Sequence, residues 1–244
     1  YAKRTNMKSY NSSQSKLPGC KDQDAIVSII KATTLDTLLV FTSGGNYLYV
    51  PVFELTENKW KDEGTHLNNI SSYDGSDKII SVICVNKFRD DLNVALASSG
   101  GSIKRVNLND FVVSRYTRAL SCMKLHDKER LVAAFITNGK TDIAVLYASG
   151  QIVRYDESQV PVVGLKAGGV RSGSRSIDTE LVGAIGLYEN DKRNIMIATD
   201  KGGIKPIYPR YVNSSSRNTV GTLSFKSFKS DHHDAVGIIS YAEG

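Results

Sequence analysis

The sequence lacks any long hydrophobic run, and no stretch approaches the ~18 apolar residues that a membrane-spanning helix needs. The basic N-terminus YAKRTNMKSY is followed by no apolar segment, which argues against a secretory signal. Cysteine is scarce: Cys20, Cys84 and Cys122 are far apart and form no C-x-x-C pair. Neither a zinc site nor a disulfide framework is indicated, so a reducing cytosol is the expected environment.

Signatures of common catalytic sites are also missing. KAGG and KGG occur, but the phosphate loop G-x-x-x-x-G-K-[ST] does not, and no serine nucleophile elbow is present. His66 and His126 stand alone, so we expect them to be solvated or to cap turns. His232 and His233 have acidic neighbours, but adjacent residues of a strand point to opposite faces, which favours an exposed turn over a metal site. We predict no catalytic residue and no metal site.

Charged residues of both signs are present, with a modest basic excess. The 31 lysines and arginines against 25 acidic residues give a net charge of +6, which permits a nucleic-acid partner without requiring one. By range, the net charge is +3 for 1–40, −3 for 41–95, +4 for 96–144, 0 for 145–193 and +2 for 194–244. Positive charge is therefore concentrated in the first, third and fifth ranges.

Short apolar strands joined by glycine turns recur along the chain. The junctions align with a difference of one residue in the glycine pair: LLVFTSGGNYLYV (38–50), NVALASSGGSIKRV (93–106), DIAVLYASGQIVRY (142–155) and NIMIATDKGGIKPI (194–207). Their reference glycines are spaced 56, 50 and 52 residues apart: Gly44, Gly100, Gly150 and Gly202. YAKRT (1–5) matches the second strand of the same unit. Glycine supplies the positive φ that tight hairpins need, so each junction predicts a hairpin.

Each unit then ends in a further apolar strand: AIVSIIKA (25–32), IISVICV (79–85), LVAAFIT (131–137), LVGAIGLY (181–188) and AVGIISYA (235–242). No convincing helical period accompanies these β-branched runs, which predict buried strands. The units are expected near 1–37, 38–92, 93–141, 142–193 and 194–244. Such sheets pack against copies of themselves, usually radially. We predict one all-β domain over 1–244, a propeller-like disc of about five four-stranded blades, with six if further chain precedes it.

The order of apolar strand, glycine turn, basic strand, polar segment and closing apolar strand resembles the C-terminal repeats of bacterial type IIA topoisomerase A subunits. YAKRTNMKSYNSSQSKLPGCKDQDAIVSI (1–29) and the four later junctions carry the resemblance, which covers essentially the whole chain and implies a β-pinwheel fold. Gyrase A members carry the first-blade signature Q-R-R-G-G-K-G. The corresponding SQSKLPGCKD (13–22) keeps Gln14, Lys16, Gly19 and Lys21 but not the paired arginines, which is similar to topoisomerase IV A subunits.

The resemblance implies a non-catalytic domain that binds and bends duplex DNA, assisting segment capture and topology preference during relaxation, decatenation and chromosome segregation. It implies a cytoplasmic, nucleoid-associated parent enzyme, a heterotetramer with an ATPase B subunit, that uses ATP and magnesium. We expect no cofactor in this domain and a monomer when it is isolated. Two alternatives remain: a gyrase A domain that wraps DNA, and a propeller that binds proteins, although W-D and kelch signatures are missing.

Arg115-Tyr116-Thr117 resembles the sequence around the catalytic tyrosine of these enzymes. That tyrosine belongs to a helical winged-helix region, whereas Tyr116 lies in the polar segment of an all-β repeat. We therefore expect Tyr116 not to be a nucleophile, and the segment not to be an enzyme by itself.

Basic side chains after the glycine turns and in the polar segments are the candidates for phosphate contact, which needs no reading of bases. Lys104 and Arg105 are the strongest candidates because they lie in the most positive range. The glycines of GLKAGGVRSGSR (164–175) are expected to let backbone N–H groups approach phosphate oxygens. The full set is Lys3, Arg4, Lys16, Lys21, Lys104, Arg105, Arg115, Arg118, Arg154, Lys166, Arg171, Arg175, Lys205, Arg210 and Arg217.

Overall fold

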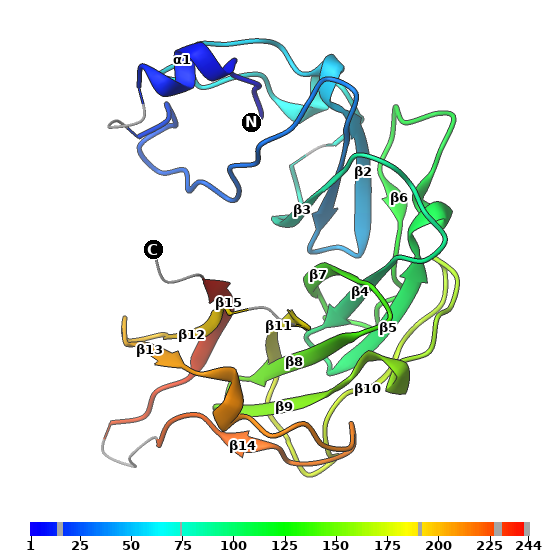
Figure 1. The fold of residues 1–244 in the computed structure, drawn as a ribbon, viewed down its shortest axis with the longest axis vertical. Helices are drawn as coiled ribbons and strands as arrows, with labels where there is room; N and C mark the ends of the chain where they lie inside the picture. Colours follow the sequence, from blue (N-terminus) through cyan, green and yellow to red (C-terminus); the bar gives the residue numbers. More distant parts are fainter. Residues whose placement is uncertain (14–16, 74, 190–191, 227–230, 242–244) are drawn as a thin grey trace. The chain divides into compact units, whose positions relative to one another are not determined.

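The computed structural model describes residues 1–13, 17–73, 75–189, 192–226 and 231–241 (Figure 1). Over these residues the chain consists mostly of short strands and loops, with one short α-helix, α1 (Met7–Asn11). Single 3₁₀ turns link strands at η1 (Val52–Glu54), η2 (Leu67–Asn69), η3 (Leu108–Phe111), η4 (Glu157–Gln159) and η5 (Pro209–Tyr211). No helix within the described ranges is long and apolar enough to cross a membrane. The chain forms two compact units, one of 1–88 with 111–122 and one of 89–110 with 123–244.

The first unit contains a four-stranded antiparallel sheet of order β3-β1-β2-β6. Its strands are β1 (Thr37–Thr42), β2 (Asn46–Pro51), β3 (Ile79–Val85) and β6 (Leu120–Ser121). The β1–β2 hairpin turns at Gly45, whose φ is +77°. Phe41 and Tyr47 extend from this hairpin to Phe111, whose ring meets each of theirs edge-on at centroid distances of 5.8 and 5.0 Å. These buried rings fill one face of the sheet.

Residues 1–5 and α1 pack in the first unit without joining its sheet. Ala2 forms an antiparallel bridge with Thr65, and Arg4 forms a parallel bridge with Glu57. The Asn6 side chain caps α1 by accepting a hydrogen bond from the Ser9 N–H at 2.9 Å. Residues 1–5 therefore lie against the polar segment that follows β2.

The second unit contains three antiparallel sheets, of orders β10-β5-β4-β7, β11-β8-β9-β14 and β13-β12-β15. Their strands are β4 (Asn93–Ser98), β5 (Ser102–Asn107), β7 (Leu131–Thr137), β8 (Thr141–Tyr147), β9 (Gln151–Asp156), β10 (Val170–Arg171), β11 (Leu181–Tyr188), β12 (Asn194–Thr199), β13 (Ile204–Ile207), β14 (Thr222–Leu223) and β15 (Ala235–Tyr241). In each sheet the long apolar strand pairs with the first strand of the preceding hairpin.

The outer strand of every four-stranded sheet comes from the following repeat. β6 pairs with β2, β10 with β5, and β14 with β9, and each of these outer strands is only two residues long. The outer edge of each four-stranded sheet is therefore closed by a polar segment, and this segment forms only a few hydrogen bonds with the sheet.

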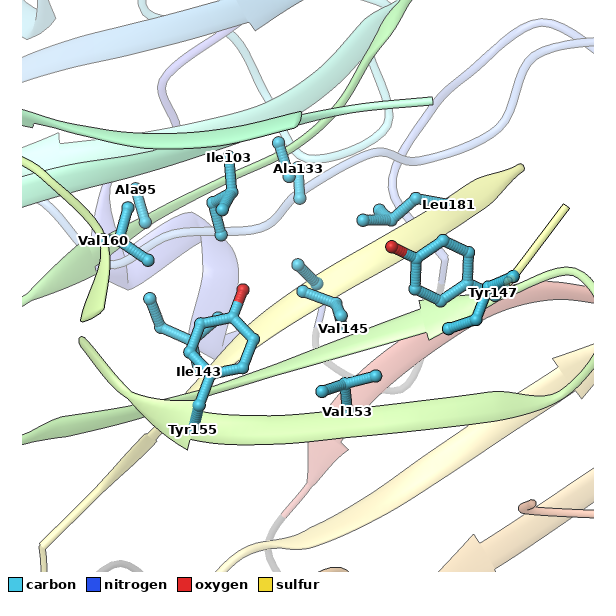
Figure 2. Packing of buried hydrophobic residues seen from close by; sticks show 13 residues of the cluster. Ala95, Ile103, Ala133, Ile143, Val145, Tyr147, Val153, Tyr155, Val160 and Leu181 are labelled. Atoms are coloured by element: carbon cyan, nitrogen blue, oxygen red, sulfur yellow. The ribbon is translucent and has the colours of Figure 1, made fainter. Parts of the chain in front are cut away.

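Strand β8 shows why the apolar runs are continuous. Ile143, Val145 and Tyr147 point into one buried cluster, whereas Ala144 and Leu146 point into another (Figure 2). Because the side chains of a strand alternate between faces, a strand buried on both faces must be apolar at every position. The sheet of β8 thus forms a layer between two cores within the second unit.

Four of the five predicted closing strands are confirmed, at 79–85, 131–137, 181–188 and 235–241. The predicted strand at 25–32 is wrong: these residues form no strand, and Val27 and Ile29 are 56% and 61% exposed. The other four pair with the first strand of a hairpin, and among the described residues the 1–5 segment supplies no such strand. The described residues thus contain four sheets, three of them four-stranded, and the expected count of five four-stranded blades is not confirmed.

The β4–β5 turn allows a matched test of the glycine pair. Gly101 has a φ of +85°, a region that costs an L-residue ~1–2 kcal/mol, so Gly101→Ala should lower the free energy of unfolding by about that amount. The atoms nearest to a Cβ on Gly100 are the end of the Glu129 side chain, which can turn away, so Gly100→Ala should cost less than ~0.5 kcal/mol. Urea unfolding followed by circular dichroism measures both. Equal losses would contradict the requirement for positive φ.

Candidate nucleic-acid interface

Lys104 is completely buried on β5, opposite Leu96 of β4. Its ammonium group donates to the carbonyl oxygens of Gly164, Leu165 and Ala167 at 2.9, 2.8 and 2.9 Å. Three carbonyls satisfy the three donors of a lysine, which compensates for burial of the charge. The prediction of a phosphate contact is therefore wrong for Lys104, which instead anchors the loop leading into β10.

Lys3 occupies the equivalent position in the first unit. Its ammonium donates to the Trp60 carbonyl at 2.6 Å and to the Asp62 carbonyl, and burial lowers the pKa of this lysine despite the attraction of Asp62. Lys205, on β13, similarly donates to the Ser224 carbonyl. Both ammonium groups thus hold backbone carbonyls of a neighbouring segment.

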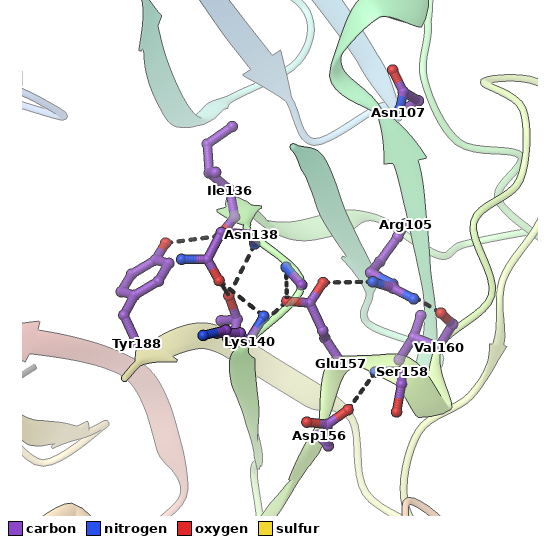
Figure 3. Close-up of polar contacts among 12 residues, drawn as sticks. Arg105, Asn107, Ile136, Asn138, Lys140, Asp156, Glu157, Ser158, Val160 and Tyr188 are labelled. Atoms are coloured by element: carbon purple, nitrogen blue, oxygen red, sulfur yellow. Dashed lines mark hydrogen bonds and ion pairs between the residues drawn. The ribbon is translucent and has the colours of Figure 1, made fainter. Parts of the chain in front are cut away.

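Arg105 forms a second clamp beside the lysine. Its Nε donates to the Val160 carbonyl at 2.9 Å, and its guanidinium pairs with Glu157 (Figure 3). The Glu157 carboxylate also accepts hydrogen bonds from the N–H groups of Gly139 and Thr141, at 2.6 and 2.9 Å. Only 12% of the Arg105 side chain is exposed, so the guanidinium serves this internal network and not a phosphate.

Glu157 is a buried carboxylate, 1% exposed. Burial alone would raise its pKa, but the hydrogen bonds that it accepts, including those from the Thr141 N–H and Arg105, outweigh burial and hold the pKa below its usual range. The charged form is therefore the form that the fold stabilises.

The same arginine clamp recurs in two other repeats. Arg4 Nε donates to the Leu55 carbonyl at 2.8 Å, and Arg154 donates to the Val212 carbonyl at 3.2 Å. These carbonyls and that of Val160 all belong to the residue that ends a 3₁₀ turn. Each arginine also pairs with a carboxylate, Glu57 for Arg4 and Asp142 for Arg154. The basic residues after the glycine turns thus form a structural series.

Two candidates from the polar segments are also engaged inside the second unit. Arg171 donates to the carbonyls of Ser174 and Ile177 at 3.2 and 3.0 Å. Arg217 donates to the Gln159 carbonyl at 3.0 Å and to the Arg171 carbonyl. Both side chains are half-buried and hold loops together.

Lys205 is exposed although its ammonium donates to the Ser224 carbonyl, and six further predicted residues are exposed: Lys21, Arg115, Arg118, Lys166, Arg175 and Arg210. The Lys21 ammonium lies over the Tyr1 ring, and the Arg210 guanidinium lies 4.7 and 5.1 Å from the ring centroids of Tyr208 and Tyr211. Lys16 falls outside the described residues. These six are the candidates that present charge to solvent.

Sequence reasoning missed Lys124, which is exposed and joins the loop of Lys166 through a hydrogen bond from its own N–H to the Ala167 carbonyl, at 3.2 Å. The alignment used the glycine turns, and Lys124 follows an outer strand, β6, instead of a turn. Its proximity to Lys166 appears only once the loop is folded.

Gly169, one of the glycines of 164–175, has a packing role. A Cβ on Gly169 would lie 2.6 Å from the Ile103 carbonyl oxygen, so only glycine lets this segment approach β5. The N–H groups of Ser172 and Gly173 donate to the carbonyls of Gly101 and Arg217. The segment is therefore arranged to close a sheet edge.

Tyr116 donates a hydrogen bond to the Glu54 carboxylate at 3.1 Å, and this bond raises the pKa of the phenol. His232 and His233 pair separately with Asp234 and Asp231. Across the described ranges, no three metal-ligating side chains gather into a site.

Comparison with known proteins shows which proteins the chain is similar to. A family model described as "DNA gyrase C-terminal domain, beta-propeller" matches residues 36–86 and 93–138. The chain is similar to the crystal structure of the C-terminal domain of DNA topoisomerase IV, with a TM-score of 0.86 and 28% identity, covering 99% of this chain and 75% of that one. The E. coli ParC C-terminal domain, at 14% identity and a TM-score of 0.66, shares the fold over 92% of this chain and 89% of its own.

Curated relatives extend the similarity. The A subunit of DNA topoisomerase 4 from Bacillus subtilis (strain 168) is 28% identical over 98% of this chain and 30% of its own length. The corresponding protein from Staphylococcus aureus (strain MRSA252) is 30% identical over 97% of this chain and 29% of its own length. The predicted resemblance to the C-terminal domain of topoisomerase IV A subunits is confirmed, and this chain spans about 30% of those proteins.

Lys104→Met should lower the free energy of unfolding by ~1–3 kcal/mol, because it leaves partly buried carbonyls without their donor. The control Lys166→Met removes an equal charge from an exposed residue of the same loop and should change stability by less than ~0.5 kcal/mol. Urea unfolding compares the two variants. Equal stability would contradict the structural role of Lys104.

Glu157→Gln should destabilise the protein by ~3–5 kcal/mol at neutral pH, because it leaves the mostly buried Arg105 without a counter-charge. The folded-state pKa lies below the unfolded value of about 4.3, so this contribution is present above the unfolded pKa and is lost as pH falls through the folded pKa. Glu180→Gln, which breaks the exposed pair with Arg130, should cost no more than ~1 kcal/mol. A pH-independent Glu157→Gln effect would contradict the assignment.

Proposed function

We propose that this chain is a non-catalytic domain of a topoisomerase IV A subunit that binds and bends duplex DNA, and so assists DNA segment capture and topology preference. The observation that carries the proposal is the repeated placement of exposed cations. Arg115 and Arg118 lie just before β6, Lys166 lies before β10 and Arg210 lies before β14. The segment that leads to each outer strand thus presents positive charge, two to five residues before β6 and β10 and, at Arg210, in η5, twelve residues before β14.

A surface of this kind suits the phosphate backbone, because lysine and arginine bind phosphates whatever the base sequence. Bending a duplex costs a few kcal/mol, and several ionic contacts must offset that cost. The similarity to topoisomerase 4 A subunits along nearly the whole chain supports the same assignment. In the proposed setting, its partners are the remaining domains of the parent protein and an ATPase B subunit, which use ATP and magnesium.

Removing two exposed charges should reduce the salt dependence of duplex binding. Each phosphate contact contributes ~0.9 to the negative slope of log K against log salt, so Lys166→Gln with Arg175→Gln should make the slope less negative by about two. Fluorescence anisotropy of a labelled duplex across a salt series measures the slope.

The control, Lys128→Gln with Lys140→Gln, removes the same charge from exposed residues away from the outer strands and should leave the slope unchanged. An equal effect of both pairs would assign binding to net charge alone. Salt-independent binding, or none, would favour a protein-interaction scaffold. A shift in the linking number of nicked and religated plasmid would favour gyrase-type wrapping.

A further inference from the structure

A cavity of ~590 Å³ in the first unit lies between α1 and the polar segment after β2. Its lining residues are three lysines (Lys8, Lys59 and Lys61), three serines of the α1 region, Asn6, Leu17 and Trp60, and no acidic residue of the described ranges lines it. The volume falls within the ~300–1,000 Å³ typical of small-ligand sites. The cavity therefore joins concentrated positive charge to one aromatic surface.

The aromatic wall is held from three sides. The Trp60 carbonyl accepts hydrogen bonds from the Lys3 ammonium at 2.6 Å and from the Gly19 N–H at 2.9 Å. The Tyr10 ring meets the indole edge-on at a centroid distance of 5.2 Å. A Cβ on Gly19 would lie 1.9 Å from the Lys61 carbonyl oxygen, so only glycine lets residue 19 approach the segment of Trp60 and Lys61 this closely. The Trp60 surface is thus preorganised.

Acidic groups near the cavity are already paired. Glu57 pairs with Arg4 and also accepts a hydrogen bond from the Asn6 side chain at 2.7 Å. Asp62 accepts the Lys59 N–H at 2.9 Å. Neither carboxylate lines the cavity, whereas three lysines do, and this lining favours an anionic ligand.

Shape and chemistry distinguish the ligand. A duplex presents its phosphates on a convex surface with its bases stacked inside, so it has no planar group to place in a concave site. A single strand offers a phosphate together with an unstacked base, and single-strand sites combine cationic grooves with aromatic platforms. Phosphate on the lysines and a base against the indole satisfy both parts of the lining.

We infer that this cavity binds one nucleotide of single-stranded DNA, with the phosphate on Lys8, Lys59 and Lys61 and the base against Trp60. The inference rests on the proposed DNA-binding function and deepens it by adding a site for unpaired strand. Such a site would hold a nucleotide that has left the stack where the duplex is strongly deformed.

Trp60 is the single tryptophan of the chain, so its emission reports on the cavity directly. Titration of the whole chain with an oligothymidylate of about 10 nucleotides should quench Trp60 to a plateau. Thymidine 5′-monophosphate should give a weaker quench of the same kind, and inorganic phosphate should give none. Quenching by phosphate equal to that by the oligonucleotide would reduce the cavity to an anion site and overturn the inference.

Variants test the contacts through the anisotropy of a labelled oligothymidylate. Lys59→Gln with Lys61→Gln should weaken binding at least tenfold, whereas Lys78→Gln with Lys87→Gln, an equal charge change at exposed lysines outside the cavity, should not. Trp60→Ala should weaken binding by about five- to 150-fold, the equivalent of stacking one base. Equal losses from the two lysine pairs would overturn the inference.

Failure of this inference differs from failure of the proposed function. Salt-dependent duplex binding with unchanged Trp60 emission at saturating oligothymidylate would overturn the nucleotide site alone. Quenching of Trp60 by the oligonucleotide without duplex binding would overturn the duplex function and support the cavity as a nucleotide site.

Discussion

Closing the outer edge of the hairpin in each four-stranded sheet is the constraint on which the structure depends. An unpaired strand edge exposes a row of backbone donors and acceptors, and it invites unwanted pairing. Here the closing strands are only two residues long, so ladder hydrogen bonds alone hold little of the segment. Lys104 and Arg105 supply the remaining bonds from their side chains, by reaching across the edge to the carbonyls of the incoming loop. Charged side chains in this fold therefore replace part of the backbone pairing.

Some basic side chains of this chain are bound to groups inside the fold, so the net charge of a sequence range does not by itself indicate a DNA-binding surface. The most positive range of the sequence owes two of its cations to Lys104 and Arg105, which bind carbonyls and Glu157. Of the predicted phosphate contacts that are exposed, Arg115, Arg118, Lys166 and Arg210 lie instead on the segments that lead to the outer strands. A duplex would thus meet the same segments that close the edges, so that DNA binding and sheet closure depend on one element of each repeat.

Much of this architecture is predictable from the sequence, because each hairpin carries its own local signal. The pairing of β1 with β2, or β8 with β9, follows from apolar alternation and a glycine with positive φ. The segment 25–32 has the same apolar pattern, but a strand also needs a neighbouring strand with which to form hydrogen bonds. The apolar pattern alone does not predict whether such a neighbour exists. The cavity at Trp60 has no signal in the sequence for a similar reason, since α1 and the segment after β2 are far apart in the chain and meet through contacts such as the Tyr10–Trp60 ring pair.

The alignment of the repeats indicates that Lys104 is buried, although its charge suggests a surface position. Two of the equivalent residues, Leu48 and Val153, are apolar, and in the hairpins they and Lys104 lie opposite buried apolar partners, whereas Lys3 and Lys205 stand at this position in the first and last repeats. A position that is leucine or valine in sister repeats belongs to a buried face, and a lysine there must bring its ammonium to acceptors within the fold. Lys104 donates to three carbonyls of the incoming loop. Repeats with leucine or valine at this position have no ammonium group that could bind such carbonyls. Register among the repeats is therefore a better guide to the role of a basic residue than its charge.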